Sequence, residues 1–202
     1  MKRDGTGLMV LGSLLILAAV VLTGFNLLES EQAKTASANI IRQMEAVAVT
    51  EENITETEPT VQPDHVRFPD MEMPVITVEG QSYIGTLQIP RLELDLPVIS
   101  DWNYNALKIA PCRYRGSAYS GEMILMAHNY DSHFGRLHNL RPGDEVCFTD
   151  TAGNRFIYEV DDLEEISGTD VDAMLTGEWD LTLFTCTYGG QNRVVVRCFE
   201  KA

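Results

Sequence analysis

The chain has 202 residues, enough for one domain of ordinary size together with additional segments. Its 30 acidic residues outnumber its 15 basic ones, which gives a formal net charge of −15. A charge of this sign, with no basic stripe along the chain, argues against a protein whose main partner is nucleic acid.

An apolar segment near the N-terminus predicts one membrane-spanning helix. Residues 8–28 are apolar with three polar exceptions, and at ~1.5 Å per residue they span ~32 Å, enough for the hydrocarbon core of a bilayer. Basic residues precede this segment and acidic residues follow it, so the positive-inside rule places residues 1–7 in the cytoplasm and the rest outside the cell. A cleaved signal peptide is the alternative, because Ala36-Ser37-Ala38 resembles a cleavage site. That site lies about ten residues beyond the apolar run, and the run exceeds the usual ~7–15 residues, so we favour an uncleaved anchor.

Residues 29–80 form an acidic segment that connects the anchor to the rest of the chain. It carries eleven acidic residues and three basic ones. Apolar side chains recur at helical spacing, so residues 31–49 can form an amphipathic helix that lies on the membrane, on the domain or on a partner. Four prolines predict that residues 50–74 are extended and flexible. We therefore expect mostly a spacer, whose removal at about Gly80 leaves the chemistry of the remaining domain unchanged.

Residues 81–202 predict a domain that consists mainly of β-strands. Short β-branched and apolar runs alternate there with turn residues. Eight strands with little helix suit a closed barrel, because closure leaves no sheet edge exposed. The strands are expected at 83–89, 92–99, 109–114, 123–127, 145–149, 155–160, 181–185 and 193–199, and short helical pieces at 104–108, 134–140 and 170–175.

The most informative feature is a cysteine at the end of one strand and an arginine at the start of the next. Cys186 follows the buried run 181–185, and Arg193 comes seven positions later. A two-strand unit closed by the short loop 187–192 brings the arginine back beside the cysteine. A guanidinium there can reach the thiolate or an oxyanion on its acyl adduct, which suits acyl transfer. Taken singly, each residue has a structural alternative, as a packed thiol and a solvated arginine at a sheet edge.

His128 is the best placed of the four histidines to serve such a cysteine as general base. It follows the apolar run 123–127, so it too lies where a core strand meets a loop. Catalytic cysteine and histidine residues meet in space rather than along the chain, so their distance in sequence is no objection. Taken alone, His128 would be an ordinary loop histidine.

Together these residues resemble the sortases, the membrane-bound cysteine transpeptidases of Gram-positive bacteria. The family signature is Thr-Leu-x-Thr-Cys with a downstream arginine and an upstream Gly-His-Asn or Gly-His-Arg. The corresponding residues here are Thr182-Leu183-Phe184-Thr185-Cys186, Arg193 and Ala127-His128-Asn129. The resemblance covers residues 83–199. Ala127 stands where the family usually has glycine, which leaves His128 in place unless that position needs a positive φ.

The resemblance implies the eight-stranded sortase barrel, with Cys186 as nucleophile, His128 as acid and base, and Arg193 as the group that stabilises substrate and oxyanion. Thr185 has a supporting role. The implied reaction cleaves the C-terminal sorting signal of a secreted protein through a thioacyl-enzyme and transfers the acyl group to an amine of a peptidoglycan precursor. The implied enzyme is therefore a cysteine transpeptidase that acts on peptide bonds outside the cell membrane and anchors surface proteins to the cell wall.

Three alternatives remain open at this stage. A pilin-polymerising sortase would use pilin amines, but such enzymes usually carry an Asp-Pro-aromatic lid and often a second, C-terminal membrane span; neither is visible here. The short spacing from Cys186 to Arg193 is more similar to class D or related sortases than to class A. A membrane-tethered thiol peptidase would hydrolyse its substrate with the same three residues. A non-catalytic assembly module would carry Cys186 as a packed thiol.

The sequence carries no pattern that requires a metal or cofactor. His128, His133 and His138 are five apart, which fits neither one helix face nor a usual zinc spacing, so structural roles are expected for the last two. Some sortases hold calcium with acidic loop residues, and the acidic run 161–165 is similar, although it lacks the ligand spacing of an EF-hand. If Cys186 is the nucleophile, the other three cysteines can form at most one disulfide.

Overall fold

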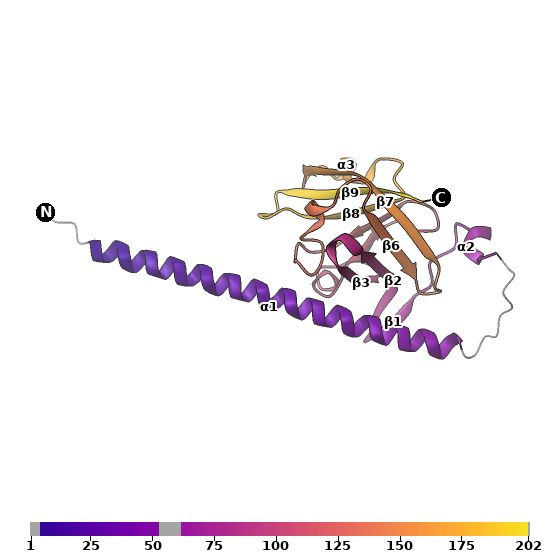
Figure 1. Ribbon diagram of the computed structural model, residues 1–202, viewed down its shortest axis with the longest axis horizontal. Helices are drawn as coiled ribbons and strands as arrows, with labels where there is room; N and C mark the ends of the chain where they lie inside the picture. The colour runs from indigo at the N-terminus through magenta and orange to yellow at the C-terminus, as the bar shows by residue number, and fades with distance from the viewer. Residues whose placement is uncertain (1–4, 53–61, 202) are drawn as a thin grey trace.

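The computed structural model describes residues 5–52 and 62–201, which form a long N-terminal helix, two short helices and a β-barrel (Figure 1). The helices are α1 (Gly5–Glu52), α2 (Asp64–Arg67) and α3 (Val171–Leu175), with 3-10 turns η1 (Pro90–Leu92), η2 (Ala106–Lys108) and η3 (Leu137–Asn139). The strands are β1 (Ile76–Val78), β2 (Gln81–Ile89), β3 (Leu94–Ile99), β4 (Cys112–Arg115), β5 (Met123–Met126), β6 (Glu145–Asp150), β7 (Arg155–Ser167), β8 (Leu181–Cys186) and β9 (Asn192–Glu200).

The strands from β2 to β9 form a closed eight-stranded barrel. They follow the order β2-β3-β4-β5-β8-β9-β7-β6, and β6 pairs again with β2 to close the ring. The pairs β3–β4 and β5–β8 are parallel, and the others are antiparallel. Apolar side chains such as Leu87, Leu125, Phe148 and Leu183 fill the interior and are fully buried. The predicted sortase-type barrel architecture is therefore confirmed.

Strand β7 is longer than the sequence predicts, and it contains the acidic run 161–165. Its second half pairs with β9 from Asp162 opposite Arg197 to Ser167 opposite Asn192. The acidic run 161–165 does not predict a strand, because acidic residues are infrequent in strands. Pairing with the long strand β9 outweighs that local preference. The three predicted helical pieces contain η2, η3 and α3, each shorter than expected.

The predicted membrane span and the predicted amphipathic helix are parts of one continuous helix, α1. Its first half exposes apolar side chains such as Leu14 and Leu22, and by length and composition α1 contains a stretch that can cross a membrane. Its second half packs on β1 and β3. The buried side chains there are Ala33, Ser37, Ile40 and Met44, whose spacing places them on one helix face.

The connecting segment is not a free spacer in the part that the structure describes. The His65 ring stacks on Tyr119 at 4.8 Å between ring centroids, and Met73 is buried in the barrel core. Thr151 Oγ1 donates a hydrogen bond to the carbonyl oxygen of Pro74 at 2.8 Å. The expectation that residues 50–74 are extended and flexible is therefore wrong for 50–52, which belong to α1, and for 62–74, while residues 53–61 lie outside the described residues. A single buried methionine among prolines has no periodicity from which this packing could be predicted.

Two methionines of this segment allow a direct test of its packing. Met73 is buried and Met71, two residues earlier, is exposed. We expect Met73→Ala to lower the free energy of unfolding by about 2–5 kcal/mol, because it removes core contacts and leaves a cavity. Met71→Ala, the matched control, should change it by less than about 0.5 kcal/mol. Urea denaturation of the two variants measures both values, and equal small effects would show that the segment is not part of the core.

Candidate active site

Strand β8 delivers Cys186 to the surface at one end of the barrel. Leu181 to Thr185 are buried on both faces of the sheet, whereas the Cys186 side chain is partly exposed. In the antiparallel pairing of β8 with β9, Cys186 lies directly opposite Arg193. The strand register therefore brings Cys186 and Arg193 together as predicted, because the Cα atoms of directly opposite residues in such a ladder lie ~4.5–5.5 Å apart.

His128 reaches the same level on the other side of β8. The parallel pairing of β5 with β8 ends at Met126 opposite Phe184, and His128 and Cys186 each follow that pair by two residues. Thr185 Oγ1 donates a buried hydrogen bond to the carbonyl oxygen of Ala127 at 2.8 Å. This bond links the residue before the cysteine to the residue before the histidine. Thr185, expected only to support the site, therefore fixes the two strand ends against each other.

The alanine before His128 does not strain the backbone. Among the described non-glycine residues, positive φ angles occur at Glu79 and Glu93. Ala127 therefore does not need the conformational freedom of glycine, and the departure from the family pattern leaves the strand end intact.

The turn after β8 holds the Arg193 guanidinium. Arg193 Nη1 donates hydrogen bonds to the carbonyl oxygens of Gly190 and Asn192, each at 3.0 Å. Gly168, directly after β7, leaves the space that this requires, because a Cβ atom there would lie 2.6 Å from the Gln191 carbonyl oxygen and 2.8 Å from Arg193 Nη1. Sequence reasoning missed Gly168, since its role depends on a contact between distant segments.

The outer face beside the site carries an apolar cluster. Phe184, Val195 and Met126 each lie two positions from one of the three candidate catalytic residues, and a strand points residues two apart to the same face. Phe184 and Val195 are buried there together with Met174 of α3. The candidate site thus borders a packed apolar cluster, of which Met126 is only partly buried.

Arg197 attaches α3 to this face of the barrel. Its side chain is buried and donates to the carbonyl oxygens of Ala173 at 2.6 Å and Met174 at 2.9 Å, while its Nε donates to Glu164 at 2.9 Å. Glu164 belongs to the acidic run 161–165 that was considered for calcium. Its carboxylate is already bound to the Arg197 guanidinium. In the described part of the chain, no group of three or more His, Cys, Asp or Glu residues is arranged to hold a metal ion.

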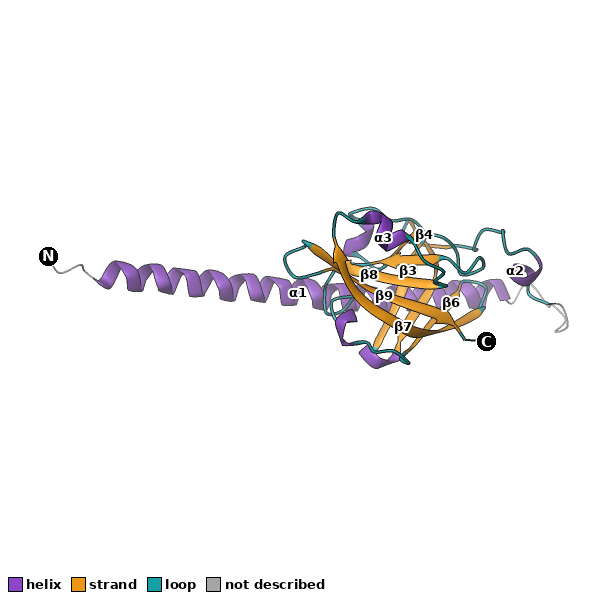
Figure 2. Ribbon diagram, turned by 90° about the horizontal axis from the view of Figure 1, so that it is seen from above, coloured by secondary structure: helices purple, strands orange, loops and turns teal. Residues whose placement is uncertain are grey.

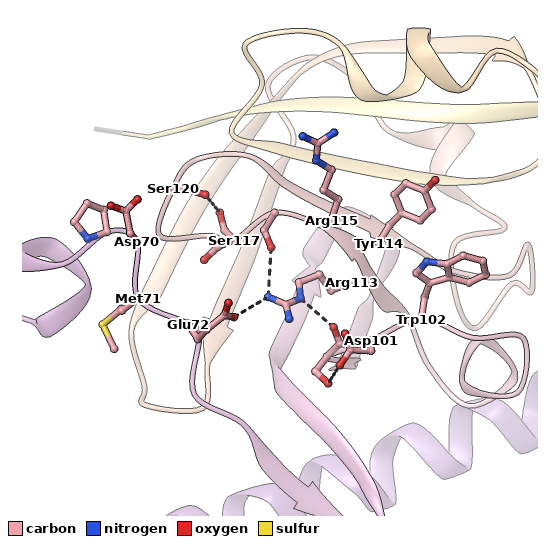
Figure 3. Close-up of a pocket in the computed structure, with 13 residues that line it drawn as sticks. Asp70, Met71, Glu72, Asp101, Trp102, Arg113, Tyr114, Arg115, Ser117 and Ser120 are labelled. Atoms are coloured by element: carbon pink, nitrogen blue, oxygen red, sulfur yellow. Dashed lines mark hydrogen bonds and ion pairs between the residues drawn. The ribbon is translucent and has the colours of Figure 1, made fainter.

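A separate pocket of about 610 Å³ lies beside β4 (Figure 3). Arg113 occupies its centre, where Nε donates to the Ser100 carbonyl oxygen at 2.9 Å and Nη1 lies 3.9 Å from Glu72. Tyr114 joins this pocket to the apolar cluster through an edge contact with Phe184 at 5.5 Å between ring centroids. The described residues that line the pocket do not include any of the three candidate catalytic residues.

His133 lies behind the site as a buried neutral histidine. Its ring is fully buried and packs 5.5 Å from Tyr130, whose ring lies 5.0 Å from that of His128. Burial first, and the neighbouring His128 second, lower the pKa of His133 from 6.5 to about 4.

All four cysteines are free thiols; Cys112, Cys147 and Cys198 are buried, which suits structural rather than chemical roles.

The buried state of His133 predicts a specific dependence of stability on pH. Unfolded His133 binds a proton near pH 6.5, but the folded protein binds it only near pH 4, so folding stability falls as the pH falls through this window. The full effect is on the order of 3 kcal/mol. His133→Leu should make the unfolding free energy less steep between pH 6.5 and 4, as measured by urea denaturation at several pH values. His138→Leu, at an exposed histidine, is the control; an unchanged slope in His133→Leu would contradict a buried neutral ring.

Comparison with known proteins agrees with this fold. A sortase domain model matches residues 87–201. Similar solved structures include a Clostridium perfringens sortase D5 transpeptidase (22% identity, TM-score 0.52, 59% of this chain and 79% of that one) and sortase A from Corynebacterium diphtheriae (17%, 0.54, 92% and 96%). A third is sortase C from Clostridium perfringens SM101 (20%, 0.50, 82% and 89%), whereas no curated protein sequence matches significantly. Because the matched domain makes up more than half of the chain, this protein belongs to the sortase family.

Proposed function

We propose that this sortase is a cysteine transpeptidase in which Cys186, His128 and Arg193 carry the chemistry. The observation that supports this most directly is the strand register, which places Arg193 opposite Cys186 on one side and His128 level with Cys186 on the other. Cys186 is partly exposed whereas the other three cysteines are buried, which also favours a chemical role for Cys186.

In the proposed reaction, the Cys186 thiolate attacks a backbone carbonyl carbon of the substrate. A free cysteine thiol is mostly protonated at neutral pH, so His128 takes its proton and later gives a proton to the leaving amine. The carbonyl oxygen becomes an oxyanion in the tetrahedral intermediate, where the Arg193 guanidinium can stabilise it. Collapse of the intermediate leaves a thioester on Cys186, and a second amine then attacks that thioester and releases the product.

The substrates follow from the family and from the anchor. We propose that the acyl donor is a secreted protein with a C-terminal sorting signal, and that the acceptor is an amine of a peptidoglycan precursor. One N-terminal apolar helix suits a single-pass membrane protein. In the proposed orientation, residues 1–7 lie in the cytoplasm and the barrel lies outside the cell membrane, where donor and acceptor meet.

The decisive experiment is a panel of peptides and amine acceptors, read by mass spectrometry, with wild type and Cys186→Ala compared. We expect wild type to form a thioacyl adduct and an amide product, and Cys186→Ala to form neither while remaining folded, because it removes the nucleophile but little volume. Product without added amine would favour the hydrolytic thiol peptidase over the transpeptidase. Turnover by Cys186→Ala would exclude Cys186 as nucleophile.

Arg193 should not be replaceable by lysine. Its Nη1 is held by two carbonyl oxygens of the turn, which leaves the rest of the planar group to bind substrate oxygens. A lysine keeps the charge but not this fork. We expect Arg193→Lys to lower kcat/KM by at least about 100-fold, close to the effect of Arg193→Ala, which corresponds to about 2.7 kcal/mol. Activity within a few-fold of wild type would show that a positive charge alone suffices.

A further inference from the structure

Helix α1 connects the apolar span to the barrel without a joint. It is helical from Gly5 to Glu52, so its exposed apolar half and its docked half share one axis. Ala33, Ile40 and Met44 are buried on the docked half, and Ile40 and Met44 belong to a core cluster with β1, β2 and β3. The barrel is therefore attached to the membrane-spanning half by a rigid rod rather than by a flexible tether.

The rod also contacts the loop that follows His128. Ser30 Oγ lies 3.2 Å from Ser132 Oγ, to which it donates, and accepts from the Ser132 backbone N–H at 3.3 Å. Ser132 is four residues beyond His128, and the loop is closed by a 3.2 Å hydrogen bond from Phe134 N–H to the His128 carbonyl oxygen. The candidate acid and base thus belongs to a loop that is attached directly to the anchor helix.

This contact lies at the expected level of the lipid headgroups. Ser30 follows the last residue of the apolar run, Leu28, by two positions, which is only ~3 Å along a helix. A headgroup layer is ~5–8 Å thick on each side of the hydrocarbon core. Four residues of chain span at most ~14 Å, so His128 lies close above the membrane surface if residues 8–28 cross it.

The same end of the barrel carries an exposed aromatic residue. Strand β9 runs from the β8–β9 turn toward the C-terminus, and Figures 1 and 2 show that the C-terminus lies at the end of the barrel away from the N-terminal half of α1. The β8–β9 turn therefore faces the apolar half of α1. Tyr188 in this turn is 79% exposed, and tyrosine is enriched at membrane interfaces, where its ring is apolar and its hydroxyl is hydrated.

We propose that α1 seats the active-site end of the barrel on the membrane surface, so that the enzyme acts on a bond held at a fixed, short height above the bilayer. Ser30 and Ser132 are positioning residues in this arrangement, and the bilayer interface is the partner of the Tyr188 turn. The inference rests on the proposed function for its activity readout. In addition, the enzyme selects substrates by the length of chain between the cleaved bond and the membrane.

The test uses full-length protein in lipid vesicles and bilayer-inserted peptides whose cleaved sequence is taken from the panel described above. Each peptide carries its own apolar membrane-spanning segment, and the spacer between that segment and the cleaved sequence is varied from about 2 to 20 residues. We expect the wild-type rate to peak at a short spacer, because a shorter one cannot reach the site and a longer one dilutes it. Beyond the peak, a fourfold longer flexible spacer should lower the rate about eightfold.

Two insertions between Leu28 and Glu29 distinguish a rigid rod from a tether. Seven residues of strongly helix-forming sequence raise the barrel by ~10 Å while nearly preserving the helix face, so the best spacer should lengthen by about three residues. Seven residues of Gly and Ser should flatten the dependence on spacer length. Tyr188→Ala should lower the rate on inserted peptides but not on soluble ones. If all these proteins share the wild-type profile, the inference is wrong and the proposed function stands.

A cross-link tests the docking without any activity. In Cys186→Ala, the pair Ser30→Cys with Ser132→Cys should form a disulfide in vesicles, whereas Ser30→Cys with Ser120→Cys, in the loop between β4 and β5, should not. Failure of the first pair to form a disulfide would overturn the docking of α1 on the His128 loop. If no peptide is turned over by the wild type, the proposed function fails, and the cross-link still decides whether α1 docks on the His128 loop as inferred.

Discussion

The candidate site depends on the pairing of β8 with two different neighbours. Its parallel ladder with β5 and its antiparallel ladder with β9 bring the ends of three strands to one level, and those ends carry His128, Cys186 and Arg193. The hydrogen bond from Thr185 to the Ala127 carbonyl oxygen prevents one strand end from sliding past the other. A register slip of one residue would turn Cys186 to the opposite face of the sheet, so the chemistry requires the whole ladder.

Closure of the barrel makes this arrangement rigid. Because β6 pairs with β2, every strand of the ring has two neighbours, and the ends of β5, β8 and β9 cannot separate without breaking the ring. The outer face is held in the same way, since the buried Arg197 joins β9 to the backbone carbonyl oxygens of α3. A buried guanidinium with several acceptors is favourable only in a fixed geometry. The apolar cluster beside the site is therefore preformed.

Docking of α1 extends this rigidity from the barrel to the apolar half of that helix. The helix face that contains Ala33, Ile40 and Met44 adds apolar burial to the side of the barrel formed by β1 and β3. Residues 62–74 pack elsewhere on the barrel through His65 and Met73. The acidic region between span and barrel therefore takes part in the fold, although its composition alone is typical of a solvated linker.

The sequence by itself determined the apolar helix that can span a membrane, the eight barrel strands and the three candidate catalytic residues, because each depends on local pattern: an apolar run, apolar strands ending at a reactive side chain, and a five-residue motif. Only the tertiary structure decided the length of β7, the burial of Met73, the space that Gly168 leaves for Arg193, and the continuity and docking of α1. These features depend on contacts between residues far apart in the chain. An acidic strand, an isolated methionine or a single glycine has no periodicity that reveals its partner, and only packing against that partner makes it structured.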